Sequence, residues 1–212
     1  DHWEETLLAG SSFGKEFVVT CFGESHGKCV GVVVDGCPAG LELSEKDIDS
    51  ELAKRIPKKT QIVSYRREED KSAILSGVFN GYTTGAPICV VTMNKRARPE
   101  EYELIKDTPR PGHADYPARM KYGGFNDYRG GGRFSGRITV SFVMAGAIAK
   151  KLLDLIGVKV LAFTVQIGPV RVNRPPTIEQ IQRNTYKSSV RCPDLNCTRR
   201  MEEAIERAKS LG

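Results

Sequence analysis

The sequence predicts an α+β domain, on three observations. Segments rich in β-branched residues, typical of strands, gather between residues 16 and 93. A long apolar helix is expected over 139–156 and an amphipathic helix over 197–211. No internal repeat and no break in composition divides the 212 residues, so we expect one domain spanning 1–212.

The first strands and the first helix follow from local pattern. Residues 16–22 are strand-like, and the apolar run Val30–Val34 predicts a second, buried strand over 28–34. Ser44 with Asp47 three residues later resembles a capping box and predicts a helix start. Pro57 would end that helix. Three apolar residues should share its buried face: Ile48, Leu52 and Ile56.

Two further strands are expected over 72–79 and 86–93, joined by a turn at 81–85. Residues 94–137 are polar, rich in Gly and Pro and without regular periodicity, and such a long irregular stretch is usually functional or disordered. The predicted helix 139–156 carries small residues that let a neighbour pack closely, and 158–167 is strand-like. The small residues are Ala145, Gly146, Ala147 and Ala149.

The formal net charge of +6 suits nucleic acid, an anionic membrane or a polyanionic small molecule. The basic residues occur in short groups rather than in one run, which favours a concave anion pocket, although a solvated basic surface explains about half of the groups. No apolar run approaches the roughly 18 residues needed to span a bilayer. The first residues also lack the basic start of a secretory signal. We therefore expect no membrane association and no nucleic-acid partner.

The six cysteines do not form the pattern of a disulfide framework, and a reducing compartment is expected. Cys192 and Cys197 are separated by four residues, which is wider than the usual zinc knuckle, and no His follows them. The sequence therefore predicts no metal site.

Two of the three histidines lie in glycine-bearing turns. His26 is in the turn 23–27 (Gly-Glu-Ser-His-Gly), and His113 is in 110–116 (Arg-Pro-Gly-His-Ala-Asp-Tyr). A His at a strand end is accessible to a cleft, and its pKa near neutrality lets it donate or accept a proton. Either His alone is more simply explained by a local backbone hydrogen bond, but two such turns in a chain with only three histidines favour a functional role.

Residues 127–137 combine three consecutive glycines with Arg129, Arg133 and Arg137 and lead into the long predicted helix. Glycines let backbone amides approach an anion, and arginines supply charge-assisted hydrogen bonds. The segment is neither a Walker loop nor a Rossmann fingerprint. A flexible linker and an Arg-Gly-Gly type RNA contact, here in one copy, are the alternatives.

Taken together, these segments resemble the chorismate synthase family, from about Ser12 to the end of the chain. The matching motifs occur in the family's order. They are residues 13–17, 23–27, 35–40, 66–68, 74–78, 83–85, 110–116, 121–123 and 127–133.

The resemblance implies a fold, a reaction and a set of site residues. The family fold is a β-α-β sandwich of antiparallel sheets around long helices, here incomplete, and it assembles as a homotetramer. The reaction is the 1,4-anti elimination of phosphate from 5-enolpyruvylshikimate 3-phosphate, giving chorismate for aromatic amino-acid biosynthesis. It needs reduced FMN, and whether NADPH or an outside reductase reduces the flavin stays open. The expected compartment is the cytoplasm, or a plastid in a eukaryote.

The site residues implied by the resemblance fall into three groups. His26 and His113 match the catalytic pair, one acting on the flavin and one on the leaving phosphate. The substrate-binding arginines match Arg55, Arg110 and Arg137. The segment that contacts the flavin matches Arg133, Phe134 and Ser135.

Three departures from the family pattern motivate a second hypothesis. Phe134 replaces a hydroxyl-bearing residue, Ile138 replaces a carboxylate, and Gln61 replaces an arginine. The family's C-terminal half, which supplies further flavin contacts, is not covered by the resemblance. The alternative is a diverged, non-catalytic relative that binds an anion or a partner subunit.

Overall fold

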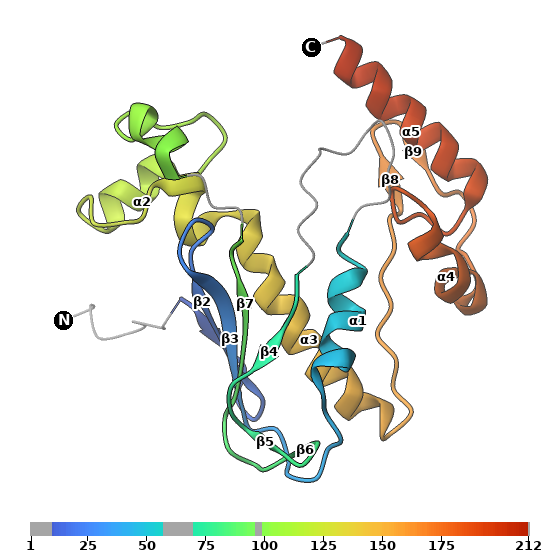
Figure 1. The fold of residues 1–212 in the computed structure, drawn as a ribbon. Coiled ribbons are helices and arrows are strands. Elements are labelled where there is room, and N and C mark those ends of the chain that lie inside the picture. The colour runs from blue at the N-terminus through green and yellow to red at the C-terminus, as the bar shows by residue number, and fades with distance from the viewer. Residues whose placement is uncertain (1–9, 57–69, 96–98, 212) are drawn as a thin grey trace, which may run out of the picture. The chain divides into compact units, whose positions relative to one another are not determined.

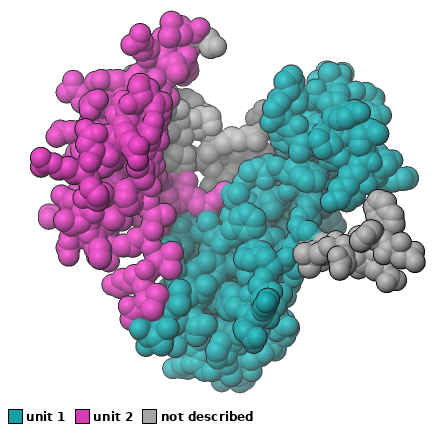
Figure 2. Space-filling model, turned by 180° about the vertical axis from the view of Figure 1, so that it is seen from behind, with its two compact units in different colours: residues 1–53, 68–156 teal, residues 54–67, 157–212 magenta. Residues whose placement is uncertain are grey.

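The computed structural model describes residues 10–56, 70–95 and 99–211, which form two compact units (Figures 1 and 2). Unit 1 comprises residues 1–53 and 68–156, and unit 2 comprises 54–67 and 157–212. Several residues singled out in the sequence lie outside the described ranges. These are His2, Pro57, Gln61 and the motif 66–68.

Unit 1 is built on an antiparallel sheet with the strand order β1-β2-β3-β7-β4. Its strands are β1 Ser12–Phe13, β2 Val18–Gly23, β3 Cys29–Asp35, β4 Ala73–Ile74 and β7 Ile88–Met93. The structure thus confirms the strands expected over 16–22, 28–34 and 86–93, and the α+β class with antiparallel sheets is confirmed with them.

The region expected as one strand and a turn has a different structure. Residues 72–79 divide into β4 and β5 (Val78–Phe79), and the expected turn contains β6 (Tyr82–Thr83), which pairs with β5. Asn80 and Gly81 connect β5 to β6 with φ of 49° and 81°. An Asn-Gly pair with two positive φ angles forms the tight hairpin turn that matches strand twist. The prediction missed that hairpin.

Helix α1 (Glu45–Ala53) begins where the sequence predicted and ends earlier. The amide and hydroxyl of Ser44 both donate to Asp47 Oδ2 at 2.8 Å, so the amide just before the helix has an acceptor. Ile48 and Leu52 are buried, but the helix ends at Ala53, so the placement of Ile56 on its face was wrong. Helix α3 (Thr139–Asp154) matches the predicted long helix.

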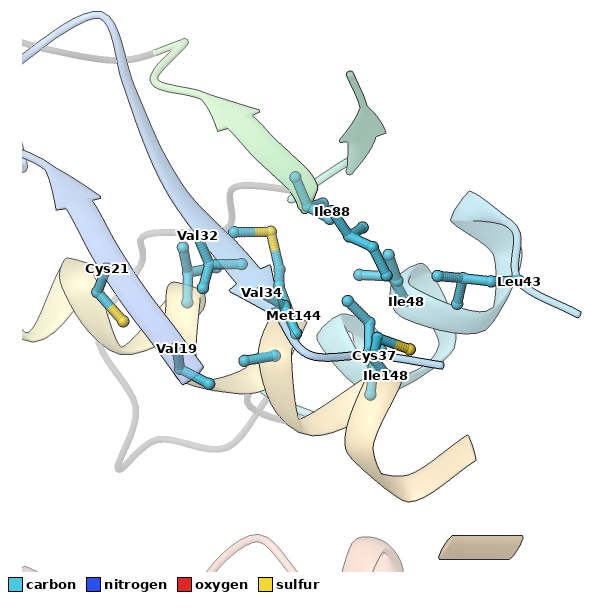
Figure 3. Packing of buried hydrophobic residues seen from close by; sticks show 14 of the residues in the cluster. Val19, Cys21, Val32, Val34, Cys37, Leu43, Ile48, Ile88, Met144 and Ile148 are labelled. Atoms are coloured by element: carbon cyan, nitrogen blue, oxygen red, sulfur yellow. The ribbon is translucent and has the colours of Figure 1, made fainter. Parts of the chain in front are cut away.

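The core of unit 1 lies where α3 and α1 pack beside the sheet (Figures 1 and 3). Residues paired across the strands share the covered face: Val19 lies opposite Val34, and Val34 lies opposite Ile88. Figure 3 shows Met144 and Ile148 of α3 directed toward these side chains, and both are fully buried. This packing anchors the strand ends and the start of α3, which carry the candidate site.

The stretch 94–137 was expected to be irregular, and its described residues, 94–95 and 99–137, form a short helix and several tight turns. Helix α2 spans Asp115–Lys121. The 3₁₀ turns are η1 Pro99–Ile105, η2 Arg129–Phe134 and η3 Gly136–Ile138.

Unit 2 contains the hairpin β8 (Gln166–Ile167) and β9 (Val170–Arg171) and the helices α4 (Ile178–Asn184), η4 (Thr185–Lys187) and α5 (Leu195–Ser210). The predicted C-terminal helix is confirmed. The strand expected over 158–167 was wrong except at its end, because residues 158–165 pair with no strand in the described part of the chain.

A second cluster of buried residues holds unit 2 together, with Cys192 and Met201 fully buried at its centre. Of the helices that the structure describes, none has both the length and the apolar character needed to cross a bilayer.

Candidate functional site

The first histidine turn lies between β2 and β3, and hydrogen bonds from Asn94 close it. Asn94 Nδ2 donates to the carbonyls of Glu24 and Gly27, each at 2.9 Å. His26 in this turn is only 6% exposed. Its ring packs edge-on against Tyr102, with the two ring centroids 4.8 Å apart. The ring is therefore held in place at the strand end.

The second histidine turn is organised by Asp115, the first residue of α2. Arg110 donates to the Asp115 carboxylate from its amide (3.0 Å), from Nε (2.8 Å) and from Nη2 (2.8 Å). These hydrogen bonds outweigh the opposing effect of burial and lower the pKa of Asp115 to about 2. Asp115 is therefore a carboxylate throughout the physiological pH range.

His113 lies beside the same carboxylate. Its Nδ1 is 2.9 Å from Asp115 Oδ1, which is the distance of an ion pair. Within the described ranges, however, this buried nitrogen has no partner with the geometry of a hydrogen bond. His113 Nδ1 thus lies close to the Asp115 carboxylate without a hydrogen bond to it.

The loop of three consecutive glycines lies against both histidines. Gly130 and Gly131 have φ of 60° and 84°. A Cβ atom added at Gly130 would lie 2.5 Å from His26 Cδ2, and one added at Gly131 would lie 2.1 Å from His113 Cε1. Successive residues of one loop thus contact the two imidazole rings, and the structure brings together the two histidines that the sequence singled out.

Ser25 fastens this loop to the His26 turn. Its Oγ donates to the carbonyls of Arg129 (3.1 Å) and Gly130 (3.3 Å), and its amide donates to the Gly132 carbonyl (3.2 Å). At the start of the loop, Arg129 forms a two-point hydrogen bond with Asp127 at 2.8 and 2.7 Å. Burial raises the pKa of Asp127, but the bonds from Arg129 outweigh it and leave that pKa below its usual value.

Two of the three arginines expected to bind substrate, Arg110 and Arg137, are held by protein groups. Arg110 is paired with Asp115, as described above. Arg137 donates from Nε to Asn94 Oδ1 at 3.0 Å and from Nη1 to Asp70 Oδ1. The Asn94 side chain therefore links Arg137 to the His26 turn, and a bound anion would share these guanidinium groups with the carboxylates.

The third expected arginine, Arg55, belongs to unit 2, where it follows the end of α1 in the chain.

The segment assigned to the flavin lies between the glycine loop and α3. The Arg133 guanidinium donates to Ser11 Oγ and, at 3.2 Å, to the Gly10 carbonyl. Phe134 is 42% exposed, with its ring centroid 6.3 Å from that of Tyr122. Ser135 Oγ accepts a hydrogen bond from the Arg137 amide at 3.3 Å, so its own hydroxyl proton can be donated to a ligand. The chemistry of these three groups suits a flavin mononucleotide: a cation and a hydroxyl donor suit its phosphate, and an exposed aromatic face suits its ring.

An open pocket of about 240 Å³ adjoins the second histidine turn. Tyr102, Arg110, Asp115, Arg119 and Tyr128 line part of it. The residues that sequence reasoning missed are Asn94, Tyr102 and Asp115. Only Asp115 had a signal, since it lies in the same short motif as Arg110 and His113. Within the described part of the chain, no group of three or more His, Cys, Asp or Glu residues could hold a metal ion.

Comparison with known proteins places the chain in a family. Residues 17–212 match the family model described as chorismate synthase. The chain is 50% identical over 206 residues to the chorismate synthase of Dehalococcoides mccartyi and 52% identical over 209 residues to that of Methanocella arvoryzae. These alignments cover 95% and 97% of this chain and 56% of each relative, so the chain spans little more than half the length of the curated relatives it matches.

A solved structure gives the same result for the fold. A crystal structure of a chorismate synthase superposes with a TM-score of 0.71 at 28% identity, covering 93% of this chain and 54% of that one. The fold expected from the resemblance is thereby confirmed.

Proposed function

Because the chain belongs to the chorismate synthase family, we propose that the full-length protein is a carbon–oxygen lyase that forms chorismate. It would eliminate phosphate from 5-enolpyruvylshikimate 3-phosphate. The observation that carries this proposal is the contact of His26 and His113 with successive glycines of one arginine-bearing loop. Two proton-transfer groups and several guanidinium groups then lie within one unit of the fold.

The chemistry of the substrate explains this set of residues. The substrate carries a phosphate and two carboxylates, and guanidinium groups bind both kinds of anion with two-point geometry. Arg110 and Arg137 would orient the substrate and stabilise the charge that develops on the departing phosphate. Arg55, carried by unit 2, is proposed to bind the same substrate on the strength of the resemblance alone.

The two histidines are proposed to hold the protons that the reaction moves. One imidazole would keep a proton beside the flavin, and the other would donate one to the leaving phosphate. Burial of His26 limits the access of water to its ring. The Asp115 carboxylate places a negative charge beside the ring of His113.

The proposed cofactor is reduced FMN, held by Arg133, Phe134 and Ser135. When bound, it supplies the electron-rich centre that the elimination needs although the reaction has no net redox change. NADPH as its reductant, a homotetrameric assembly and a cytoplasmic location are proposed from the family alone. Size-exclusion chromatography with light scattering checks the assembly.

The test is anaerobic release of phosphate from 5-enolpyruvylshikimate 3-phosphate by the full-length protein, with and without reduced FMN. We expect release only with reduced FMN. His26→Ala and His113→Ala should each slow release by about 10²–10⁴-fold, the usual scale for acid–base groups. Full activity in both variants would refute the catalytic roles. No release by the wild type would instead favour the diverged, non-catalytic relative motivated by Phe134 and Ile138.

A further inference from the structure

We propose that Gly130 and Gly131 are positioning residues, each of which fixes one histidine ring: Gly130 fixes His26, and Gly131 fixes His113. This inference rests on the proposed function, because it gives the two glycines a role in the same reaction. It adds that the separation of the two rings is set by the backbone of one loop, and that each ring has its own backbone contact.

The contacts leave no space for a side chain on either glycine. A Cβ atom on Gly131 would lie 2.1 Å from His113 Cε1 and 2.8 Å from His113 Nε2. A Cβ atom on Gly130 would lie 2.5 Å from His26 Cδ2 and 2.7 Å from His26 Nε2. Carbon atoms in favourable contact are about 3.5–4.0 Å apart, so even a methyl group would displace a ring or the loop.

The loop cannot easily yield. The Ser25 hydroxyl shares its one proton between the carbonyls of Arg129 and Gly130, and the Ser25 amide donates to the Gly132 carbonyl. The φ angles of Gly130 and Gly131, 60° and 84°, lie in the left-handed region, which disfavours side chains even where space exists. Glycine at these positions therefore serves two separate requirements, the conformation of the loop and the closeness of the rings.

The rings are also held on their other sides. Tyr102 packs against His26, and Asp115 lies 2.9 Å from Nδ1 of His113. Each imidazole is thus confined between a glycine and a second group. Displacing one catalytic group by about 1 Å can slow a reaction by about 10²-fold, which makes these contacts matter for rate as well as for stability.

The decisive experiment separates the ring contact from backbone strain by thermal unfolding of the full-length protein. Gly131→Ala is compared with Gly85→Ala, since Gly85 has the same φ of 84° while the nearest atom to its Cβ would be Ala39 Cβ at 3.7 Å. Both variants should lower Tm through strain, and Gly131→Ala should lower it further. In a His113→Ala background the two losses should become equal, whereas in a His26→Ala background Gly131→Ala should remain the worse.

The proposal would be overturned if Gly131→Ala lowered Tm by the same amount in the wild type and in the His113→Ala background. The double variant keeps the test valid even if Gly131→Ala alone does not fold. Gly130→Ala provides the reciprocal test. His26→Ala should restore only part of the Tm that Gly130→Ala loses, because the new Cβ would still lie 2.8 Å from Ser25 Oγ.

A spectroscopic measurement checks which ring moves. With ¹³Cε1-labelled histidine, signals are assigned through His26→Asn and His113→Asn. Gly131→Ala should shift the His113 signal and leave that of His26, Gly130→Ala should do the reverse, and Gly85→Ala should shift neither. An unshifted His113 signal in folded Gly131→Ala would contradict the proposal.

Activity then links position to rate. Gly131→Ala should reduce kcat by about 10²-fold, and Gly85→Ala should leave kcat unchanged. The Tm and NMR results do not depend on any enzymatic activity. If the wild type released no phosphate, the proposed function would fail while the ring contacts could still be confirmed.

Discussion

Asp115 contacts two basic side chains: Arg110 donates three hydrogen bonds to it, and His113 Nδ1 lies 2.9 Å from its Oδ1. If Arg110 binds a substrate anion as proposed, that anion would compete with the Asp115 carboxylate for the guanidinium. The hydrogen bonds to Asp115 also hold the guanidinium in one orientation, so less conformational entropy would be lost on binding. Asp115 is in this sense a positioning residue for both neighbours.

The depressed pKa of Asp115 makes a prediction for acid stability. Its pKa falls from the ordinary 3.8 to about 2 in the folded protein, so ionised Asp115 favours folding at pH values above the unfolded pKa. As pH falls from about 4 to 2, that contribution, on the order of 2 kcal/mol, should be lost. Urea unfolding of wild type and Asp115→Asn at several pH values measures it.

Asp115→Asn should be less stable than the wild type at pH 6 and nearly equal to it at pH 2. Asp107→Asn is a suitable control, because Asp107 is 70% exposed in its ion pair with Arg119 and such pairs contribute little. A constant difference between wild type and Asp115→Asn at every pH would contradict this prediction.

At the scale of the elements, hydrogen bonds from Arg191 hold the segment 54–56, which follows α1 in the chain and belongs to unit 2. The Arg191 Nη2 donates to the carbonyls of Lys54 (2.7 Å) and Ile56 (3.3 Å), on either side of Arg55. The guanidinium also lies 5.2 Å from the Tyr186 ring centroid. Arg191 has a φ of 60°, so these contacts hold a backbone conformation that is unfavourable for a residue with a side chain.

Two substitutions of Arg191 should distinguish the stability that its contacts contribute from the cost of its strained backbone conformation. Arg191→Ala and Arg191→Gly both lose the guanidinium, and both should be less stable than the wild type. The glycine variant should be more stable than the alanine variant by roughly 0.5–1 kcal/mol, since glycine avoids the strain but loses more entropy on folding. Urea titration measures both differences, and an alanine variant as stable as the glycine variant would argue against strain.

Elements determined by local pattern could be predicted from the sequence. The apolar run at Val30–Val34, the start of α1 at Ser44 and the long apolar stretch of α3 each depend on neighbours close in the chain. The strand expected over 158–167 formed only at its end, in β8, because β-propensity does not supply a pairing partner. The Asn80-Gly81 hairpin was predictable, because Asn-Gly is the strongest short-range hairpin signal.

In the candidate site, too, features set by local sequence could be predicted and features set by tertiary contacts could not. Both histidines and the arginine loop were identified from the sequence, because each lies in a recognisable local motif. Their contacts with Tyr102 and with individual glycines, and the bond from Asn94 to Arg137, depend on tertiary structure. No spacing along the chain could indicate them.

For the whole molecule, the two buried clusters share no residue among those described, one around Met144 in unit 1 and one around Met201 in unit 2. Met144→Ala and Met201→Ala each remove a fully buried side chain and should each cost about 2–5 kcal/mol. Hydrogen exchange measured by mass spectrometry should show faster exchange in β2, β3 and α3 for the first variant. The second should affect α5 and the β8–β9 hairpin.

Faster exchange across both units in either variant would show that the clusters unfold together. Leu155→Ala, at a residue that is 70% exposed, serves as the control and should change exchange little.

The hydrogen bonds of Ser25 have a consequence for how the molecule folds. Ser25 and Arg129 are 104 residues apart in the chain, so closing that loop costs entropy that no local structure repays. Contacts of such long range slow folding, and we expect them to form after the strands and α3 have assembled. The pairing of His26 with the glycine loop should therefore be among the last steps of refolding, and recovery of activity should lag behind recovery of helical circular dichroism.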